Sequence, residues 1–542
     1  MIGQLSMQAT GAAAVTAPRA VGWLSSSAAR IASNVSPQCA LRARCLKPCQ
    51  GGPLRVRTSL PQARRCVAAQ GSMTSLTMGV ITKDSAPPKE DLIQQANATS
   101  VGQRLQELEE LWAKGEGPAH TDCKLRLFGK KEEEVRVTLY RDTAAWCPYC
   151  QKVWLQLEEK QIPYRVYKVN MRSYGDKPQE FLQKVPSGLL PAIEVDGQLV
   201  TESLVIMQLL ESNFDGPKMC PDPGSPQFKE ANELLRLERQ LFGDWCSLVF
   251  RPSGGLGFGG LTIGGDSSKA AFEKTMDRVE AALANHPESP WFLGGDIPSI
   301  VDLQYISHVE RMLASCLYWK GMQLRGTERW PRLEKWIDSF EQRPSYQATK
   351  SDYFTHVRDI PPQYGPGYAD NGEEVEAATR AIGGQEGSWQ LPLELRSPGA
   401  LEPLSPHMDQ GDEAARQEAA CKLLRNLDAV VRFCCRGAGS PGAKQFTAPL
   451  ADPYAKPNMD WAPEVDVMLR HVAAALLAGD ALEPARQDML ANDVQGGADS
   501  QQLVKCLAYL RERVGVPRDM SFPAAMQLRA HLNWAIAAVE SA

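Results

Sequence analysis

Cys147 and Cys150 are the residues of this chain whose type and spacing best suit chemistry. They lie in Trp146-Cys147-Pro148-Tyr149-Cys150, after an alternating segment typical of a strand and at the start of a helical pattern. At a helix N-terminus, unpaired N–H groups and the helix dipole favour thiolate over thiol and can lower a cysteine pKa from ~8.5 toward ~3.5–7.5. Because a thiolate is the nucleophile of disulfide exchange, we expect Cys147 to attack. Cys150 could resolve a mixed disulfide but is less exposed, so turnover through Cys147 alone and turnover through both cysteines are both open.

The other cysteines do not extend this pair into a metal site or a disulfide framework. Four of the fourteen lie within the first 70 residues (Cys39, Cys45, Cys49, Cys66), and the remainder are scattered. A single Cys-x-x-Cys without a second pair is a poor zinc site, so we expect no metal. The alternative to a redox pair is that Cys147 and Cys150 are inert core residues.

The segments around this pair predict a thioredoxin-like order of elements. Residues 135–140 and 164–169 alternate as strands do, with a helical pattern between them, which indicates a parallel βαβ unit with a right-handed crossover. A short helix then precedes two apolar runs joined by Asp196-Gly197, a strong hairpin signal. A helix from Glu202 to Phe214 completes the order β-α-β-α-β-β-α.

Helical periods dominate the rest of the chain. Four helical segments are expected between residues 226 and 345, and four apolar stripes after residue 412, where Gly479 ends the second. Gly254–Gly265 has no following Lys-Ser/Thr, so we interpret it as a flexible connection and not as a phosphate cradle. The expected organisation is a presequence, a lead-in segment, a thioredoxin-like domain, an all-helical domain, a Pro/Gly-rich linker and a helical extension (1–70, 71–134, 135–215, 226–356, 357–411 and 412–542).

Charge and composition limit the classes of partner and predict an N-terminal targeting segment. The net charge is −5 and no apolar run reaches the ~18–20 residues of a membrane span, so we expect neither a nucleic-acid nor a membrane partner. The first ~70 residues carry many Arg and Ser, whereas the first acidic residue is Asp84. This pattern is typical of an organelle transit peptide. We expect the chloroplast stroma, with the mitochondrion and a disordered basic tail as alternatives.

The motifs together resemble the glutathione transferase superfamily. Cys147-Pro148-Tyr149-Cys150 is the glutaredoxin active-site tetrapeptide, and Gly188-Leu189-Leu190-Pro191 is similar to the transferases' strand entry with a cis-proline. Glu202-Ser203 matches the pair that binds the γ-glutamyl end of glutathione, and Lys177-Pro178 falls at the spacing of an omega-type lysine-proline. Ser299-Ile300-Val301-Asp302 resembles the family's capping box, in which Asp302 is structural. The resemblance covers residues ~135–355, and it is strongest to the cysteine-type iota class of photosynthetic organisms.

The resemblance implies a site and an activity. Glutathione is the implied co-substrate, with Leu190 and Pro191 on its cysteinyl backbone, Glu202 and Ser203 on its γ-glutamyl end and Lys177 on its glycyl carboxylate. The implied activity is thiol transfer, deglutathionylation or reduction of an oxidant such as dehydroascorbate, with a small or protein disulfide as acceptor. Conjugation should be weak, because a cysteine thiolate forms a disulfide with glutathione.

Several alternatives remain at this point. Glu202 and Ser203 fit a plain helix cap, and Lys177 fits a solvated surface charge. A glutathione-bridged iron–sulfur cluster on Cys147 and a homodimer also remain open. The alternative function is a non-catalytic scaffold that acts through the helical extension. Five aromatics are candidates for an acceptor pocket but are more often core (Trp245, Phe250, Phe258, Trp291, Tyr305).

Overall fold

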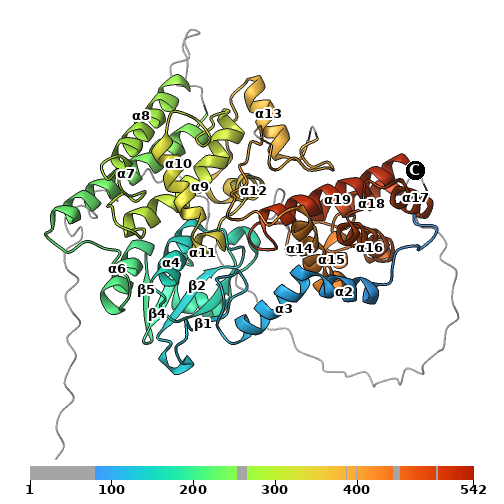
Figure 1. Ribbon diagram of the computed structural model, residues 1–542, viewed down its shortest axis with the longest axis horizontal. Helices are drawn as coiled ribbons and strands as arrows, with labels where there is room; N and C mark the ends of the chain where they lie inside the picture. The colour runs from blue at the N-terminus through green and yellow to red at the C-terminus, as the bar shows by residue number, and fades with distance from the viewer. Residues whose placement is uncertain (1–79, 253–264, 386, 398, 443–451, 496–498) are drawn as a thin grey trace, which may run out of the picture. The chain divides into compact units, whose positions relative to one another are not determined.

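The computed structural model describes residues 80–542 apart from 253–264, 386, 398, 443–451 and 496–498 (Figure 1). The expected transit peptide and the Gly254–Gly265 connection, except for its last residue, lie outside these residues. The described residues belong to one compact unit. Among them, no helix is long and apolar enough to cross a membrane.

A five-stranded mixed sheet forms the base of the Cys147 region. Its strand order is β1-β3-β2-β4-β5, with β2 (Val137–Asp142) parallel to β3 (Tyr164–Val169) and antiparallel to β4 (Ala192–Val195). The βαβ unit closes through α4 (Pro148–Glu159), as the alternating segments predicted. Two short edge strands complete the sheet, β5 (Gln198–Thr201) beside β4 and β1 (Leu125–Arg126) beside β3.

The predicted hairpin and its flanking helices are present. β4 pairs with β5 across Asp196 and Gly197, which have φ values of 51° and 80°. Positive φ at both central residues gives the turn the twist that antiparallel strands require. The helices α5 (Gln179–Lys184) and α6 (Ser203–Asn213) complete the thioredoxin-like order. The prediction of a thioredoxin-like domain is therefore confirmed.

The all-helical domain is arranged around α9 (Ile300–Lys320), which is buried along almost its whole length. α9 contacts α4 of the sheet domain as well as α7 and α12. Asp302 accepts hydrogen bonds from the backbone and hydroxyl of Ser299, so the predicted capping box begins this helix. The surrounding helices are α7 (Pro226–Val249), α8 (Gly265–Leu283), α10 (Pro331–Glu341), α11 (Pro344–Gln347), α12 (Tyr353–Tyr364) and α13 (Glu373–Ile382).

The segment expected to be a linker, 357–411, contains regular structure. Most of α12 and all of α13 lie in it, and Pro361 and Pro362 are inside α12. These prolines occupy the last turn of α12, so the helix ends soon after them at Tyr364. The proline content of this segment therefore did not predict its secondary structure.

The helical extension packs on the lead-in segment. Figure 1 shows α2 (Lys89–Ala98) and α3 (Ser100–Ala113) beside α14 (Asp412–Arg425), which both of them contact. The apolar pattern over residues 91–113 predicts one helix, but the chain breaks at Thr99, whose side chain caps α3. The other helices of the extension are α15 (Leu427–Cys434), α16 (Ala462–Ala478, ended by Gly479 as predicted), α17 (Pro484–Asp493), α18 (Ser500–Arg511) and α19 (Phe522–Ser541). The structure thus confirms the additional all-helical region.

Candidate functional site

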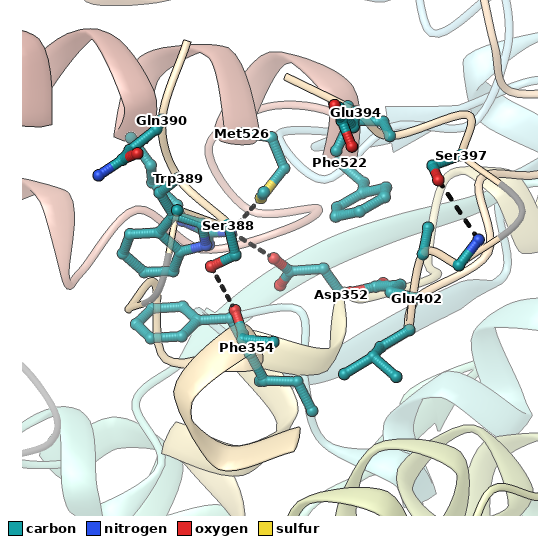
Figure 2. A pocket seen from close by; sticks show the side chains of 18 of the residues that line it. Asp352, Phe354, Ser388, Trp389, Gln390, Glu394, Ser397, Glu402, Phe522 and Met526 are labelled. Carbon is teal, nitrogen blue, oxygen red and sulfur yellow. Dashed lines mark hydrogen bonds and ion pairs between the residues drawn. The ribbon is translucent and has the colours of Figure 1, made fainter. Parts of the chain in front are cut away.

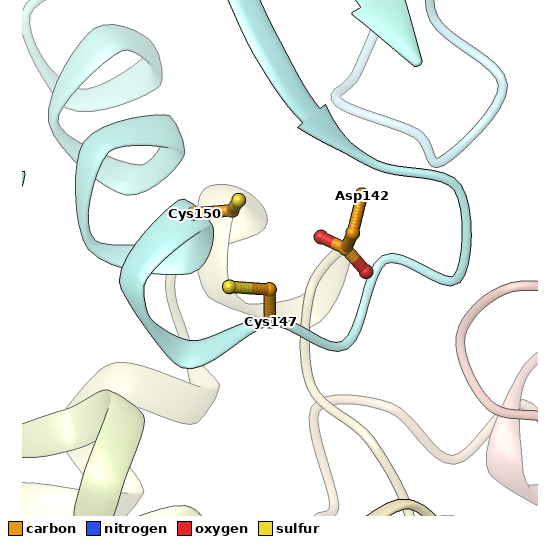
Figure 3. A group of neighbouring side chains, drawn as sticks. All are labelled: Asp142, Cys147 and Cys150. Atoms are coloured by element: carbon orange, nitrogen blue, oxygen red, sulfur yellow. The ribbon is translucent and has the colours of Figure 1, made fainter. Parts of the chain in front are cut away.

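Cys147 lies at the N-terminus of α4, between the end of β2 and the first helical residue, Pro148. Its side chain is 9% exposed, whereas Cys150 one turn later is 1% exposed. Figure 3 shows the two cysteines at the start of α4, with Asp142 opposite them at the end of β2. The predicted placement of Cys147 at a strand-to-helix junction is therefore what the structure shows.

Cys150 is held as a thiol beside Cys147. Burial raises the pKa of Cys150 well above the ordinary cysteine value, and its hydrogen bond with Cys147 and the nearby Asp142 carboxylate raise this pKa further. Asp142, Cys147 and Cys150 offer ligand atoms that lie within 4.8 Å of one another. These three donors are fewer than the four that a structural zinc site uses.

Trp146, the residue before Cys147, is held by three different partners. Its backbone N–H donates to Oδ2 of Asp142 at 2.7 Å, and its carbonyl accepts a hydrogen bond from the guanidinium of Arg311. Its indole N–H donates to Nδ1 of His356 at 3.0 Å. Since the side chain is 1% exposed, all three bonds are shielded from water, and they fix the backbone that leads into Cys147.

Buried groups on α9 orient the imidazole of His356. Because an indole N–H can only donate, Nδ1 of His356 must accept, which leaves Nε2 as the donor to Glu310 Oε1 at 3.0 Å. Burial lowers the pKa of His356, in agreement with a neutral ring. Burial works to raise the pKa of Glu310, but the hydrogen bond from His356 and the charge of Arg311 lower it to about 2. Gln151 of α4 joins this network, since it donates to Glu310 Oε2 and accepts from Arg311.

Lys177 is close enough to the cysteine pair for a thiolate there to raise its pKa. Its ammonium donates to the carbonyl of Gly188 at 2.6 Å. Burial lowers the pKa of Lys177 from its ordinary value. This lysine is therefore half-buried at the site, in contrast to a freely solvated surface charge.

The strand register brings the remaining predicted residues to the edge of the sheet where Cys147 lies. Ala192 pairs with Tyr140 of β2 and with Thr201 of β5, so the chain before β4 and the chain after β5 both meet the carboxyl end of β2. Leu190 and Pro191 precede Ala192 and are joined by a cis peptide bond, as the resemblance implied. Glu202 and Ser203 follow Thr201 at the start of α6.

Glu202 has an unusual backbone conformation. Its φ is 69° and its ψ is 108°, its side chain is exposed, and no hydrogen bond of that side chain to another described residue is present. A positive φ is disfavoured for a residue with a Cβ, and such strain is often found at functional sites. Ser203 is the first residue of α6, where unpaired backbone N–H groups favour an anion.

An aromatic cluster beside Cys147 was not foreseen as a unit. The ring of Tyr149 is 5.5 Å from that of His308, which is 4.7 Å from Phe242, and Phe242 is 6.1 Å from Tyr364. Tyr364 belongs to the segment expected to be a linker, which is why it was missed. Of the five aromatics considered from the sequence, Trp245 and Phe250 adjoin this cluster, because their rings are 5.4 and 5.7 Å from that of Tyr364. Trp291 and Tyr305 are buried in the helical core, and Phe258 lies outside the described residues.

Two contacts connect the loop before Lys177 with distant helical segments. The hydroxyl of Tyr174 donates to Asp359 of α12, and the hydroxyl of Tyr454 in the extension donates to the carboxylate of Asp176. Burial raises the pKa of Asp359 to about 7. No local sequence signal joins these pairs, because their partners are far apart in the chain.

Comparison with known proteins gives matches across this region. The sequence-family model of the glutathione S-transferase N-terminal domain matches residues 146–213. The family model of the glutathione S-transferase C-terminal domain matches residues 265–339. The chain is 30% identical over 209 residues to Glutathione S-transferase L1 of Arabidopsis thaliana, covering 38% of this chain and 79% of that protein. It is 29% identical over 209 residues to Protein IN2-1 homolog A of Oryza sativa subsp. japonica (38% and 78%). Glutathione S-transferase L2, chloroplastic, of Arabidopsis thaliana is 28% identical over 207 residues (38% and 64%).

Proposed function

This chain belongs to the glutathione S-transferase family, and we propose that it is a glutathione-dependent thiol–disulfide oxidoreductase with Cys147 as nucleophile. The observation that carries the proposal is the position of Cys147 at the N-cap of α4, with the Lys177 ammonium within electrostatic range. A helix N-terminus and a nearby cation both favour the thiolate that such exchange requires.

Glutathione is the proposed co-substrate, held along the sheet edge that carries Cys147. Lys177 binds the glycyl carboxylate, and the backbone of Leu190 before Pro191 pairs with the cysteinyl residue. Glu202 binds the γ-glutamyl ammonium, and Ser203 with the N–H groups of α6 binds its carboxylate. The exposed side chain of Glu202 and its strained backbone support a role that requires this residue to point outward.

The proposed reaction is two successive thiol–disulfide exchanges. The Cys147 thiolate attacks the glutathione sulfur of a mixed disulfide, forms a Cys147–glutathione disulfide and releases the acceptor as a thiolate. A second glutathione thiolate then attacks the glutathione sulfur, which releases oxidised glutathione and restores Cys147. Reduction of dehydroascorbate would also convert two glutathione molecules into oxidised glutathione, because these two molecules supply the two electrons and two protons that it needs.

We propose that Cys150 acts as a hydrogen-bond donor to the Cys147 sulfur and that turnover needs Cys147 alone. The raised pKa of Cys150 disfavours the thiolate that would be needed to resolve a mixed disulfide. A dithiol route would instead form a Cys147–Cys150 disulfide and release the first glutathione.

The proposal also includes the class of acceptor, the compartment and the assembly of the protein. The cluster of Tyr149, Phe242, His308 and Tyr364 suits a small acceptor with an apolar part, and a protein disulfide is the other acceptor class. The basic N-terminal segment supports import into the chloroplast stroma, with the mitochondrion as the alternative. Association as a homodimer is part of the same proposal.

Intact-mass analysis after incubation with oxidised glutathione tests the chemistry. We expect one glutathione adduct on the wild type and on Cys150→Ser, and none on Cys147→Ser. Efficient conjugation of a chlorinated arene that survives Cys147→Ser would overturn the proposal. If the Cys147→Ser protein retains its cellular role while a chain without residues 412–542 loses it, the scaffold alternative holds.

A further inference from the structure

We propose that the helical extension, residues 412–542, holds Cys147 in its reactive position by forming hydrogen bonds and an ion pair with the first turn of α12. This inference rests on the proposed function of Cys147, and it adds positioning residues that no motif indicated. This contact has two parts, one through the backbone of Val516 and one through the side chain of Arg529.

The first part joins Val516 to two hydroxyl groups. The N–H of Val516 donates to Oγ1 of Thr355 at 3.1 Å, and its carbonyl accepts from the hydroxyl of Ser351. Thr355 and Ser351 are 8% and 3% exposed, so these bonds lie away from water. Both backbone groups of one extension residue are thus satisfied by side chains at the start of α12.

The second part is a buried ion pair. Nη1 of Arg529 in α19 donates to Oδ2 of Asp352 at 2.6 Å, and both side chains are fully buried. Asp352 is the N-cap of α12 and accepts from the N–H of Thr355 through its other oxygen. The Arg529 guanidinium also lies over the rings of Phe354 and Trp389, at 4.6 and 5.1 Å. Asp352, Phe354, Trp389 and Met526 of α19 line a cavity of about 510 Å³. Figure 2 shows how these side chains lie around it.

From this turn, two hydrogen-bonded routes lead toward Cys147. His356 is the next residue after Thr355, and its Nδ1 accepts from the indole of Trp146, directly before Cys147. Ser351 donates through its backbone N–H to Oε1 of Glu310 at 2.9 Å, the same oxygen that His356 contacts. A shift of the first turn of α12 therefore moves both the acceptor of Trp146 and the partner of that acceptor.

Trp146 can transmit such a shift because its backbone and its indole are both held by hydrogen bonds. Its backbone N–H and carbonyl are both bound, to Asp142 and Arg311, so movement of its indole must strain these bonds or displace the residue. Displacement of Trp146 carries Cys147 away from the N–H groups of α4. Rates of reaction are sensitive to displacements of this size, since about 1 Å of misplacement can cost on the order of 100-fold.

Paired variants of full-length protein at Thr355 test the proposal. Thr355→Val keeps the shape but removes the acceptor of Val516, whereas Thr355→Ser keeps a hydroxyl. His356→Phe provides a second variant, because it keeps a flat ring but removes both the acceptor of Trp146 and the donor to Glu310. The readouts are the rate of Cys147 alkylation by iodoacetamide, followed by peptide mass spectrometry, and kcat and KM for glutathione with a glutathionylated peptide.

We expect Thr355→Val to lower both the alkylation rate and kcat by about three- to tenfold, the effect of one hydrogen bond, and His356→Phe to lower them by at least as much, with KM changed less than about twofold. Thr355→Ser should restore both rates. A lower melting temperature with an unchanged alkylation rate and kcat would overturn the inference and leave the extension a structural role. Turnover that survives Cys147→Ser would instead refute the proposed function, and the alkylation comparison would still test the positioning.

Discussion

The indole N–H of Trp146 donates to Nδ1 of His356 at 3.0 Å, although 210 positions separate the two residues in the sequence. Trp146 directly precedes the proposed nucleophile, and His356 lies in the first turn of α12, which the extension contacts. This bond therefore connects the thioredoxin-like domain with a part of the chain that has no counterpart in the matched domain models.

Trp146→Phe should lower both stability and the reactivity of Cys147. The change leaves Nδ1 of His356 buried without a donor, and we expect the free energy of unfolding to fall by about 2 kcal/mol or more. Urea unfolding and Cys147 alkylation measure the two effects. Trp154→Phe is the matched control, because Trp154 is 2% exposed and its indole nitrogen has no hydrogen-bond partner among the described residues. Equal loss of alkylation rate in both variants would contradict a specific role for the Trp146 bond.

Cys150→Ser and Cys150→Ala should differ in their effect on turnover. Serine keeps a hydrogen-bond donor near the Cys147 sulfur, so we expect Cys150→Ser to retain at least about a third of wild-type kcat, whereas alanine should lose about three- to tenfold. Steady-state kinetics with a glutathionylated peptide provides the measurement. If both variants lose activity completely and accumulate the Cys147–glutathione disulfide, Cys150 is a resolving thiol and the one-cysteine route is wrong.

Lys177→Met should raise KM for glutathione by about tenfold, because it removes one charge-assisted contact to the proposed glycyl carboxylate. Lys184→Met serves as the control, since Lys184 is paired with Glu194 on the exposed side of the sheet at 2.6 Å. Initial rates over a range of glutathione concentrations separate KM from kcat. Equal KM values for Lys177→Met and the wild type would exclude Lys177 from the glutathione site.

Glu202→Gly should stabilise the protein while it weakens glutathione binding. Glycine tolerates the φ of 69° at this position, so relief of backbone strain should add about 1 kcal/mol to the free energy of unfolding. Loss of the carboxylate should weaken glutathione binding about tenfold, measured by calorimetry. Glu202→Gln keeps the strain and removes only the charge, so it should bind weakly without the gain in stability. Tight binding by both variants would remove Glu202 from the proposed site.

The stability of the protein should fall as the pH decreases from about 7 to about 5. Burial lowers the pKa of His531 from 6.5 to about 4 in the folded state. The stabilisation from this neutral ring is present above the unfolded pKa of 6.5 and is lost as the pH falls toward 4. His531 should therefore contribute about 2 kcal/mol to the loss between pH 7 and pH 5.

His531→Gln checks this contribution, because glutamine does not titrate in that range. Urea unfolding at the two pH values should show a smaller decrease in the free energy of unfolding for the variant than for the wild type. Equal decreases would mean that His531 does not bind its proton in the way its burial indicates.

The sequence by itself determined the local elements of the chain, including those around Cys147. Strand alternation, the Asp196-Gly197 turn, the capping box at Ser299 and the helical stop at Gly479 each depend on residues that are neighbours in the chain. For the same reason it placed Cys147 at a strand-to-helix junction and put Pro191 before a strand. The position of each candidate residue on its element needed no knowledge of distant segments.

Only the tertiary structure decided which elements meet. α12 runs through Pro361 and Pro362. It brings His356, the last residue of the expected helical domain, and Tyr364, from the segment expected to be a linker, to the Cys147 region. The extension meets this helix through Val516 and Arg529. These contacts depend on burial and on hydrogen bonds between groups separated by more than a hundred residues. A periodic pattern shows that a helix has a buried face, but it does not show which partner covers that face.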